Sequence, residues 1–444
     1  MSLKTLSIDQ AVVLIGKRNA EFPDPKWSPR KKILGLTVLE RLILSAHQAG
    51  VRDFLIVELG GFQKEGPHLS FEKDKRFRKD DLHLEHVSLS DLPDIARQDK
   101  VKSHFWLFDG DVVFDPAILT DAGRDDSPLL GSFGPGIQLC HREMLPGLVE
   151  ALLKHEAATP VPQRHGEGRG AHPSAAVDDQ GKFCLKVESR EDAKRAMRYI
   201  LSTGRRPQDG FMARYFIRPV SLWLTKHLLE LNMTPNMMTA VSLAFGGLSA
   251  WLIGRGDSRS AVLAGCAFQF ASILDHCDGA NARMTFRISN IGSAVDVIGD
   301  ALVYILFFLS LPLGLYRADG RRIWLILGLL VFLSMILFYL DVFRMARPEG
   351  GGSISVASGN LFSFTKEIEE KRTQKNVRGV VEKVASRITF LFRREFFPTA
   401  VLLILIFAGT KALMAVVSIL YPVQGVYITI VANKRLRKWG PREG

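Results

Sequence analysis

The sequence predicts two parts of different fold class: an α/β domain at residues 1–203 and an all-α domain with six transmembrane spans at residues 204–444. Short apolar runs alternate with a segment of helical periodicity in the first part, which indicates a mostly parallel sheet covered by helices. Long apolar segments fill the second part, although 23% of all residues are charged. The stretch 204–210 (GRRPQDG) consists of turn-forming and charged residues, so we place the domain boundary there.

The first part contains three apolar runs that fit buried strands. These are Ala11–Ile15 (AVVLI), Asp53–Glu58 (DFLIVE) and Phe105–Phe108 (FWLF). Between the first two, Thr37–Gly50 has apolar residues at helical spacing and ends in glycine, which predicts a helix. The third strand runs into Asp-Gly-Asp at residues 109–111. Ligands of parallel sheets bind at the carboxyl ends of strands, although the same tripeptide is also common in plain turns.

Composition limits the classes of function. A net charge of +12 could indicate a nucleic-acid partner, but Lys and Arg cluster beside apolar segments, so orientation in a membrane explains them better. The four cysteines have no zinc-site spacing and are interpreted as reduced thiols. The N-terminus lacks a basic start followed by an apolar core, so no cleavable signal is expected.

The second part begins with an amphipathic segment at 211–231, which we interpret as a helix in the plane of the membrane interface, with an ordinary linker helix as the alternative. Thr234 and Pro235 then provide an N-cap and a first-turn proline. A membrane span needs about 20 residues. Six spans are expected, at Met237–Gly254, Ala261–Leu274, Ile291–Leu315, Ile323–Leu340, Phe396–Ala408 and Leu413–Ala432.

Basic residues predict the orientation of these spans. Arg344–Arg394 and Lys434–Arg442 are strongly basic, whereas Arg255–Ser260 and Gly409–Lys411 carry few basic residues and Arg317–Arg322 carries three. The positive-inside rule therefore predicts a multi-pass protein of the cell (inner) membrane. Both termini and the first domain would lie on the cytoplasmic side.

Four aspartates lie in the second and third apolar segments. Asp275 and Asp278 are three residues apart, and Asp296 and Asp300 are four apart, so each pair shares one helical face. Two such helices can build a four-carboxylate site of the kind that hard divalent cations such as Mg²⁺ or Mn²⁺ prefer. Helix capping near the interface would explain one aspartate per helix, not two.

The residues between the two pairs suit a ligand that comes close to the backbone. Gly279, Ala282 and Gly292 are small, and Arg283 offers a planar fork for phosphate or carboxylate. The whole stretch 275–300 reads D-x2-D-G-x2-A-R-x8-G-x3-D-x3-D. It resembles the signature of the CDP-alcohol phosphotransferases (phosphatidyltransferases). Thr-Pro-Asn at 234–236 with Thr239 after it is also a phrase that this family often shows before its first span.

The resemblance implies an integral-membrane enzyme that uses Mg²⁺ or Mn²⁺, transfers a phospho-alcohol group from a CDP-alcohol to an acceptor hydroxyl and releases CMP. It also implies a homodimer. Asp300 would be the general base and would also contact the metal. The implied metal ligands are Asp275, Asp278, Asp296 and Asp300. The implied nucleotide-binding residues are Asp275, Gly279, Ala282, Arg283 and Gly292.

The first part is similar to sugar-nucleotidyltransferase domains, and in particular to inositol-1-phosphate cytidylyltransferases. The strand at Ala11–Ile15, the segment Lys31–Leu36 and the Gly-Asp after FWLF carry the similarity. It implies a nucleotidyltransferase-like domain in which Asp111 holds Mg²⁺, with a second carboxylate near Glu188. The first loop (IGKRNAEFPDP) departs from the glycine-rich loop of that family, because it has a single glycine. A degenerate domain that docks, dimerises or regulates is therefore the alternative.

The pairing of the two parts resembles bifunctional inositol-phosphate cytidylyltransferase and di-myo-inositol-phosphate-phosphate synthase. That pairing implies CDP-inositol as donor and inositol phosphate as acceptor. Three alternatives remain open: a phospholipid synthase that uses CDP-diacylglycerol and a polar alcohol, an ion or proton transporter with intramembrane carboxylates, and a binding protein whose activity has lapsed.

Overall fold

The computed structural model describes residues 8–15, 32–58, 74, 76–77, 81–88, 91–92, 100–122, 131–154, 182–205, 213–288, 290–346 and 396–438. The chain forms two compact units, Met1–Thr203 and Gly204–Gly444. Each unit is considered by itself below. The basic segment at 347–395, which supports the predicted orientation, lies outside the described residues.

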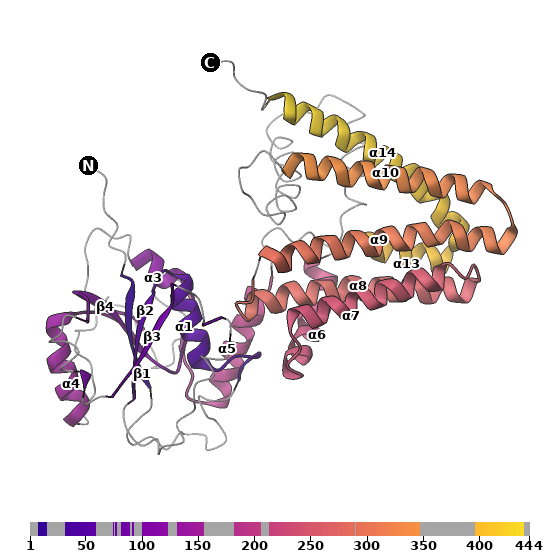
Figure 1. Cartoon of the computed structure of the whole chain (residues 1–444). Helices are drawn as coiled ribbons and strands as arrows, with labels where there is room; N and C mark the ends of the chain where they lie inside the picture. The colour runs from indigo at the N-terminus through magenta and orange to yellow at the C-terminus, as the bar shows by residue number, and fades with distance from the viewer. Residues whose placement is uncertain are drawn as a thin grey trace. The chain divides into compact units, whose positions relative to one another are not determined.

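The first unit is built on a six-stranded sheet with the strand order β3-β2-β1-β4-β7-β6 (Figure 1). Strands β3, β2, β1 and β4 are parallel, whereas β7 and β6 run antiparallel at one edge. A separate antiparallel pair joins β5 to β8. The strands are β1 (Gln10–Ile15), β2 (Asp53–Glu58), β3 (His83–Ser88), β4 (His104–Asp109), β5 (Val112–Phe114), β6 (Gly131–Gly134), β7 (Ile137–His141) and β8 (Cys184–Lys186).

Strand β1 lies in the middle of the parallel part of the sheet. Ala11, Val12 and Val13 are fully buried, which is the pattern of a strand covered on both faces. The helices of this unit are α1 (Val38–Gln48), α3 (Ala117–Ala122), α4 (Leu145–Lys154) and α5 (Arg190–Thr203), with a 3-10 turn at Arg142–Met144. The predicted α/β class is therefore confirmed.

Helix α1 has the local signals that the sequence predicts. Thr37 caps it, because its hydroxyl accepts from the backbone N–H of Glu40 at 3.1 Å while the Glu40 carboxylate accepts from the backbone N–H of Thr37 at 2.8 Å. This reciprocal pair is a capping box. The helix ends before Gly50, whose φ of +109° is accessible to glycine at little cost.

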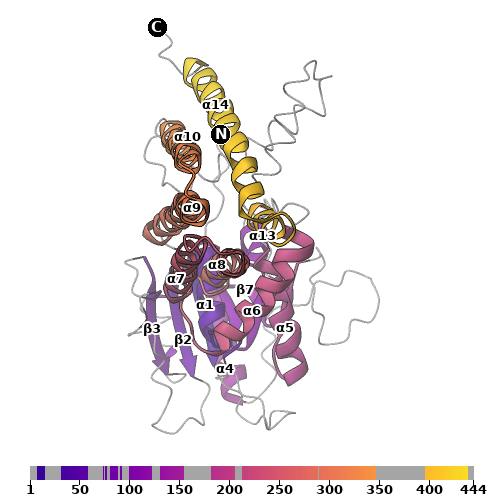
Figure 2. The same cartoon turned by 90° about the vertical axis from the view of Figure 1, so that its right-hand side faces the viewer.

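The second unit is helical throughout the residues that the structure describes (Figure 2). A π-helical turn at Ala213–Ile217 leads into α6, within the segment expected to form an amphipathic helix. Thr234 caps α7 through a 3.3 Å hydrogen bond from the backbone N–H of Met237, as predicted. The helices are α6 (Arg218–Glu230), α7 (Pro235–Ile253), α8 (Ser258–Met284), α9 (Asn290–Asp319), α10 (Ile323–Ala346), α13 (Phe397–Phe407) and α14 (Gly409–Lys438).

Within the described residues, five helices are long and apolar enough to cross a membrane: α7, α8, α9, α10 and α14. The fifth expected span, Phe396–Ala408, corresponds to α13, which has only 11 residues. About 20 residues are needed to cross the hydrocarbon core, so the predicted count of six spans is not confirmed. Exposed apolar side chains such as Trp251, Ile326 and Ile419 cover these helices. Such a surface is stable against lipid and costly in water.

Helix α7 packs along both α8 and α9, and α10 packs along α14. The contact between α7 and α9 is close at Gly246, where an added Cβ would lie 2.4 Å from Val303 Cγ2. Phe268 of α8 stacks on Phe307 of α9 with ring centroids 4.5 Å apart. Helix α7 thus packs against both helices that carry the conspicuous aspartates, and the stacked rings join α8 to α9.

Candidate metal centre

The aspartates lie at the ends of α8 and α9 that adjoin the same turn. Asp275 and Asp278 occupy the last turns of α8, and Asp296 lies near the start of α9. The chain leaves α8 through Phe286, which adopts a left-handed conformation with φ of +57°. The turn therefore returns the chain so that Asp296 of α9 lies close to Asp275 and Asp278 of α8.

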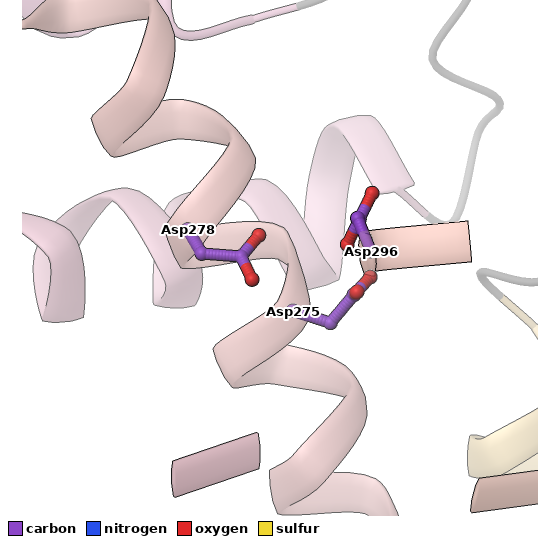
Figure 3. Close-up of side chains that lie close together, drawn as sticks. All are labelled: Asp275, Asp278 and Asp296. Atoms are coloured by element: carbon purple, nitrogen blue, oxygen red, sulfur yellow. The ribbon is translucent and has the colours of Figure 1, made fainter. Parts of the chain in front are cut away.

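Three of the four predicted carboxylates converge. One oxygen from each of Asp275, Asp278 and Asp296 lies within 4.8 Å of the other two. Figure 3 shows the two α8 carboxylates and the α9 carboxylate directed toward one another. Asp278 is only 5% exposed, and its two neighbours are half-buried.

The donor set fits a hard divalent cation. Three ionised carboxylates at this separation repel one another in a partly buried site unless positive charge lies between them. Two oxygens on opposite sides of Mg²⁺ are about 4 Å apart, since each lies about 2.1 Å from the ion. The oxygen spacing in the cluster is therefore close to what Mg²⁺ or Mn²⁺ requires.

Helix α7 contributes a hydroxyl to this cluster. Thr239 Oγ1 donates to Asp278 Oδ2 at 2.6 Å and so orients that carboxylate. Partners of this kind fix metal ligands in place and raise their affinity. The sequence links Thr239 to a family phrase but assigns it no role, because one threonine on a long apolar helix has no distinguishing spacing.

Two residues that lie between the aspartates in the sequence join the end of α8 to neighbouring segments by hydrogen bonds. Asn281 is buried and donates to the backbone carbonyl of Met233 at 2.9 Å. The Cys277 thiol donates to the carbonyl of Ser221 on α6 at 3.3 Å. These contacts hold the carboxylate-bearing turns of α8 against α6 and the start of α7.

The other predicted site residues lie around the cluster but are not among its three carboxylates. Asp300 lies one turn after Asp296 on α9 and is half-buried. Gly279 and Ala282 are half-buried on α8, as is Gly292 in the first turn of α9. Arg283 Nη2 donates to the carbonyl of Gly204 at 2.8 Å, so one face of its guanidinium is held by backbone.

In the first unit, Asp111 lies in the turn between β4 and β5. Asp109, which ends β4, accepts a hydrogen bond of 2.5 Å from Lys186 Nζ on β8. Lys186 does not feature in the sequence-based predictions, since its place beside Asp109 depends on strand pairing between distant segments. That Asp111 holds Mg²⁺ stays a prediction.

A sequence model of the CDP-alcohol phosphatidyltransferase family matches residues 232–366, which include all four aspartates. The chain contains a CDP-alcohol phosphatidyltransferase domain. The three converging carboxylates of the metal cluster thus belong to this phosphatidyltransferase domain, as the motif predicts.

Several characterised proteins are similar to this chain. A bifunctional IPC transferase and DIPP synthase of Archaeoglobus fulgidus is 35% identical over 142 residues, 32% of this chain and 28% of the relative. The protein of the same name from Thermococcus kodakarensis is 36% identical over 163 residues, 36% of each chain. These two similarities span about a third of the relatives' length. The Aquifex aeolicus protein of that name is 24% identical over 358 residues, 72% of this chain and 81% of the relative.

Proposed function

We propose that the second unit is a metal-dependent CDP-alcohol phosphotransferase of the membrane. It would move a phospho-alcohol group from a CDP-alcohol to an acceptor hydroxyl and release CMP. The observation that carries the proposal is the convergence of Asp275, Asp278 and Asp296 within the matched phosphatidyltransferase domain.

Asp275, Asp278 and Asp296 would hold Mg²⁺ or Mn²⁺ in this reaction. When bound, the ion neutralises the pyrophosphate of the donor and stabilises the charge that develops on departing CMP. Thr239 keeps the Asp278 carboxylate in its ligating orientation. The small residues of the motif would leave room for the nucleotide: Gly279, Ala282 and Gly292. Arg283 would lie near phosphate.

Asp300 is proposed as the general base. Its carboxylate would take the proton of the acceptor hydroxyl as that oxygen attacks the phosphorus that bears the alcohol. The bond from this phosphorus to the oxygen of CMP breaks, and CMP leaves with the electron pair of that bond. A carboxylate is a weak base, so close positioning of the acceptor must supply much of the acceleration.

The names of the relatives support inositol-containing substrates. Three relatives are each named bifunctional IPC transferase and DIPP synthase, which favours CDP-inositol as donor and inositol phosphate as acceptor. A second candidate is a lipid-type reaction with CDP-diacylglycerol and a polar alcohol. It is favoured by 31% identity over 138 residues to an archaetidylinositol phosphate synthase of Pyrococcus horikoshii, 30% of this chain and 65% of the relative.

The proposal also covers the membrane location, the orientation and the oligomeric state of the enzyme. Basic residues beside the apolar segments support a location in the cell membrane with both termini and the aspartates on the cytoplasmic side, where nucleotide substrates occur. The family resemblance supports a homodimer.

Purified full-length protein tests the reaction and its substrates together. The protein in detergent with Mg²⁺ is given CDP-inositol with inositol phosphate in one tube and CDP-diacylglycerol with a polar alcohol in another, and products are identified by mass spectrometry. We expect CMP and the inositol-containing product in the first tube. Turnover only in the second would establish the lipid-type reaction, and no CMP in either tube would contradict the proposed activity.

A further inference from the structure

Three carboxylates and one lysine meet at the carboxyl end of β4. From β1 the chain continues to β2 on one side of the sheet, and β4 lies on the other side, so β1 and β4 flank a topological switch point. Sheets of this type bind ligands in the crevice outside the strand ends at that point. Asp109 ends β4 there, and the next backbone N–H, of Gly110, donates to the carbonyl of Leu14 at 2.8 Å.

Lys186 reaches into this group from β8. Its Nζ donates to Asp109 Oδ2 at 2.5 Å and lies 3.8 Å from Glu188 Oε1, with Asp111 also within electrostatic range. The side chain is 25% exposed. The ammonium therefore contacts the carboxylates of Asp109 and Glu188 and is only partly open to solvent.

The backbone fixes Lys186 in this place. Strand β8 pairs with β5 so that Lys186 stands opposite Val112, the residue after Asp111. The next residue, Val187, donates its N–H to the carbonyl of Asp111 at 2.9 Å. The backbone of Lys186 is thus part of a two-stranded ribbon, which holds its Cα beside the turn that carries Asp111.

Lys186 Nζ forms ion pairs with Asp109 at 2.5 Å and with Glu188 at 3.8 Å. Each pair favours the charged ammonium form of the lysine over the neutral amine. A divalent ion bound to the same Asp109 carboxylate would lie beside this ammonium and be repelled by it. The carboxylates present therefore do not fit a nucleotide-bound Mg²⁺ while Lys186 stays in place.

We propose that Lys186 takes the position that a divalent cation would occupy, so that the first unit does not carry out metal-dependent nucleotidyl transfer. Asp109, Asp111 and Glu188 then serve as the counter-ions of a lysine. The loop after β1 contains a single glycine, which agrees with this assignment. A loop that binds a triphosphate through several backbone N–H groups is usually rich in glycine.

The inference also places the protein in a reaction sequence, a step that rests on the proposed function of the second unit. If the first unit makes no CDP-alcohol, a separate cytidylyltransferase must supply it. That reaction joins the phosphate of an alcohol phosphate to the CMP part of CTP and expels pyrophosphate.

Metal binding to the first unit tests the inference directly. The full-length protein would carry Asp275→Asn and Asp278→Asn, which disable the membrane cluster, and Mn²⁺ binding would be followed by electron paramagnetic resonance. We expect no bound Mn²⁺ while Lys186 is present. We expect about one equivalent after Lys186→Ala or Lys186→Gln, because either change removes the ammonium that pairs with Asp109 and Glu188.

Lys182→Ala is the matched control, because Lys182 makes a salt bridge to Asp121 at 2.7 Å in the same unit but lies outside the group. It should bind no Mn²⁺. Mn²⁺ bound in the presence of Lys186 and lost on Asp109→Asn would overturn the inference, as would Lys186 variants that gain none.

An assay on the unaltered chain keeps the inference testable if the variants do not fold. With CTP, inositol phosphate and Mg²⁺ the protein should release no pyrophosphate, whereas supplied CDP-inositol should still yield CMP. Pyrophosphate release that Asp111→Asn removes would overturn the inference. A lack of CMP both with CDP-inositol and with CDP-diacylglycerol and a polar alcohol would instead contradict the proposed function of the second unit, so the two failures are distinct.

Discussion

The Thr239 hydroxyl on α7 donates a 2.6 Å hydrogen bond to Asp278 on α8, between residues 39 positions apart in the chain. Asp278 is nearly buried, so a misdirected carboxylate there has little water to solvate it. The bond therefore couples the packing of α7 to the geometry of the metal cluster.

Thr239→Val should weaken metal binding without removing it. The substitution keeps the shape of the side chain and deletes the hydroxyl donor. Loss of a hydrogen-bond partner of a metal-binding side chain lowers the affinity for the metal about 10–100-fold. A Mg²⁺ titration of CMP release measures the effect, with Thr239→Ser as the control that retains the donor. An unchanged Mg²⁺ requirement in Thr239→Val would show that the hydrogen bond does not position Asp278 for metal.

Asp300→Asn should abolish turnover while sparing donor binding. The amide cannot accept the acceptor's proton, and loss of a general base costs about 10²–10⁴-fold in rate. CMP release gives the rate, and Mg²⁺-dependent thermal stabilisation by the CDP-alcohol reports binding.

Asp319→Asn is the matched control for Asp300→Asn. Asp319 ends the same helix and pairs with Lys411 at 3.2 Å, away from the cluster. It should leave turnover within about twofold of the native rate, since it is a substitution remote from the site. Native turnover in Asp300→Asn would remove the base assignment.

Gly246→Ala should destabilise the second unit. An added Cβ would lie 2.4 Å from Val303 Cγ2 on α9, and forced overpacking typically costs about 1–3 kcal/mol. Thermal unfolding in detergent measures the loss. Gly247→Ala meets nothing within 4 Å and should be neutral or slightly stabilising, because alanine favours helix more than glycine does. Equal behaviour of the two variants would contradict the tight contact of α7 and α9.

Lys186→Met should change the alkaline stability of the first unit. The folded pKa of Lys186 lies above its ordinary value of 10.5, so its charge contributes stability that is fully present below pH 10.5 and lost as the pH rises beyond it. The unfolding temperature of native protein and variant, followed from pH 7 to 12, should differ most at low pH and converge at high pH. A constant difference across this range would show that the ammonium charge is not what stabilises the fold.

Local patterns determined most of what the sequence could predict. The buried run of β1, the capping box of α1 and the spacing of the aspartates each depend on residues close in the chain, and the structure contains the expected elements. Strand β3 was not predicted, because its sequence HLEHVS has only two apolar residues and no regular alternation, and the strand lies at the edge of the sheet. The expected count of six spans is not confirmed, because α13 has only 11 residues.

Contacts between distant segments account for the rest. Thr239 reaches Asp278 only because α7 packs along α8, and Lys186 reaches Asp109 only because β8 pairs with β5. Neither side chain stands out by spacing or composition. Each donates a hydrogen bond to an aspartate that the sequence could identify.

The dependence of CMP release on Mg²⁺, compared between the native protein and Asp275→Asn, tests the central claim most directly. The account predicts saturable stimulation of the native enzyme by Mg²⁺, no release in excess chelator, and a loss of at least about 100-fold in Asp275→Asn, since the ion stabilises the charge on departing CMP. Undiminished CMP release in excess chelator, or native turnover in Asp275→Asn, would contradict it.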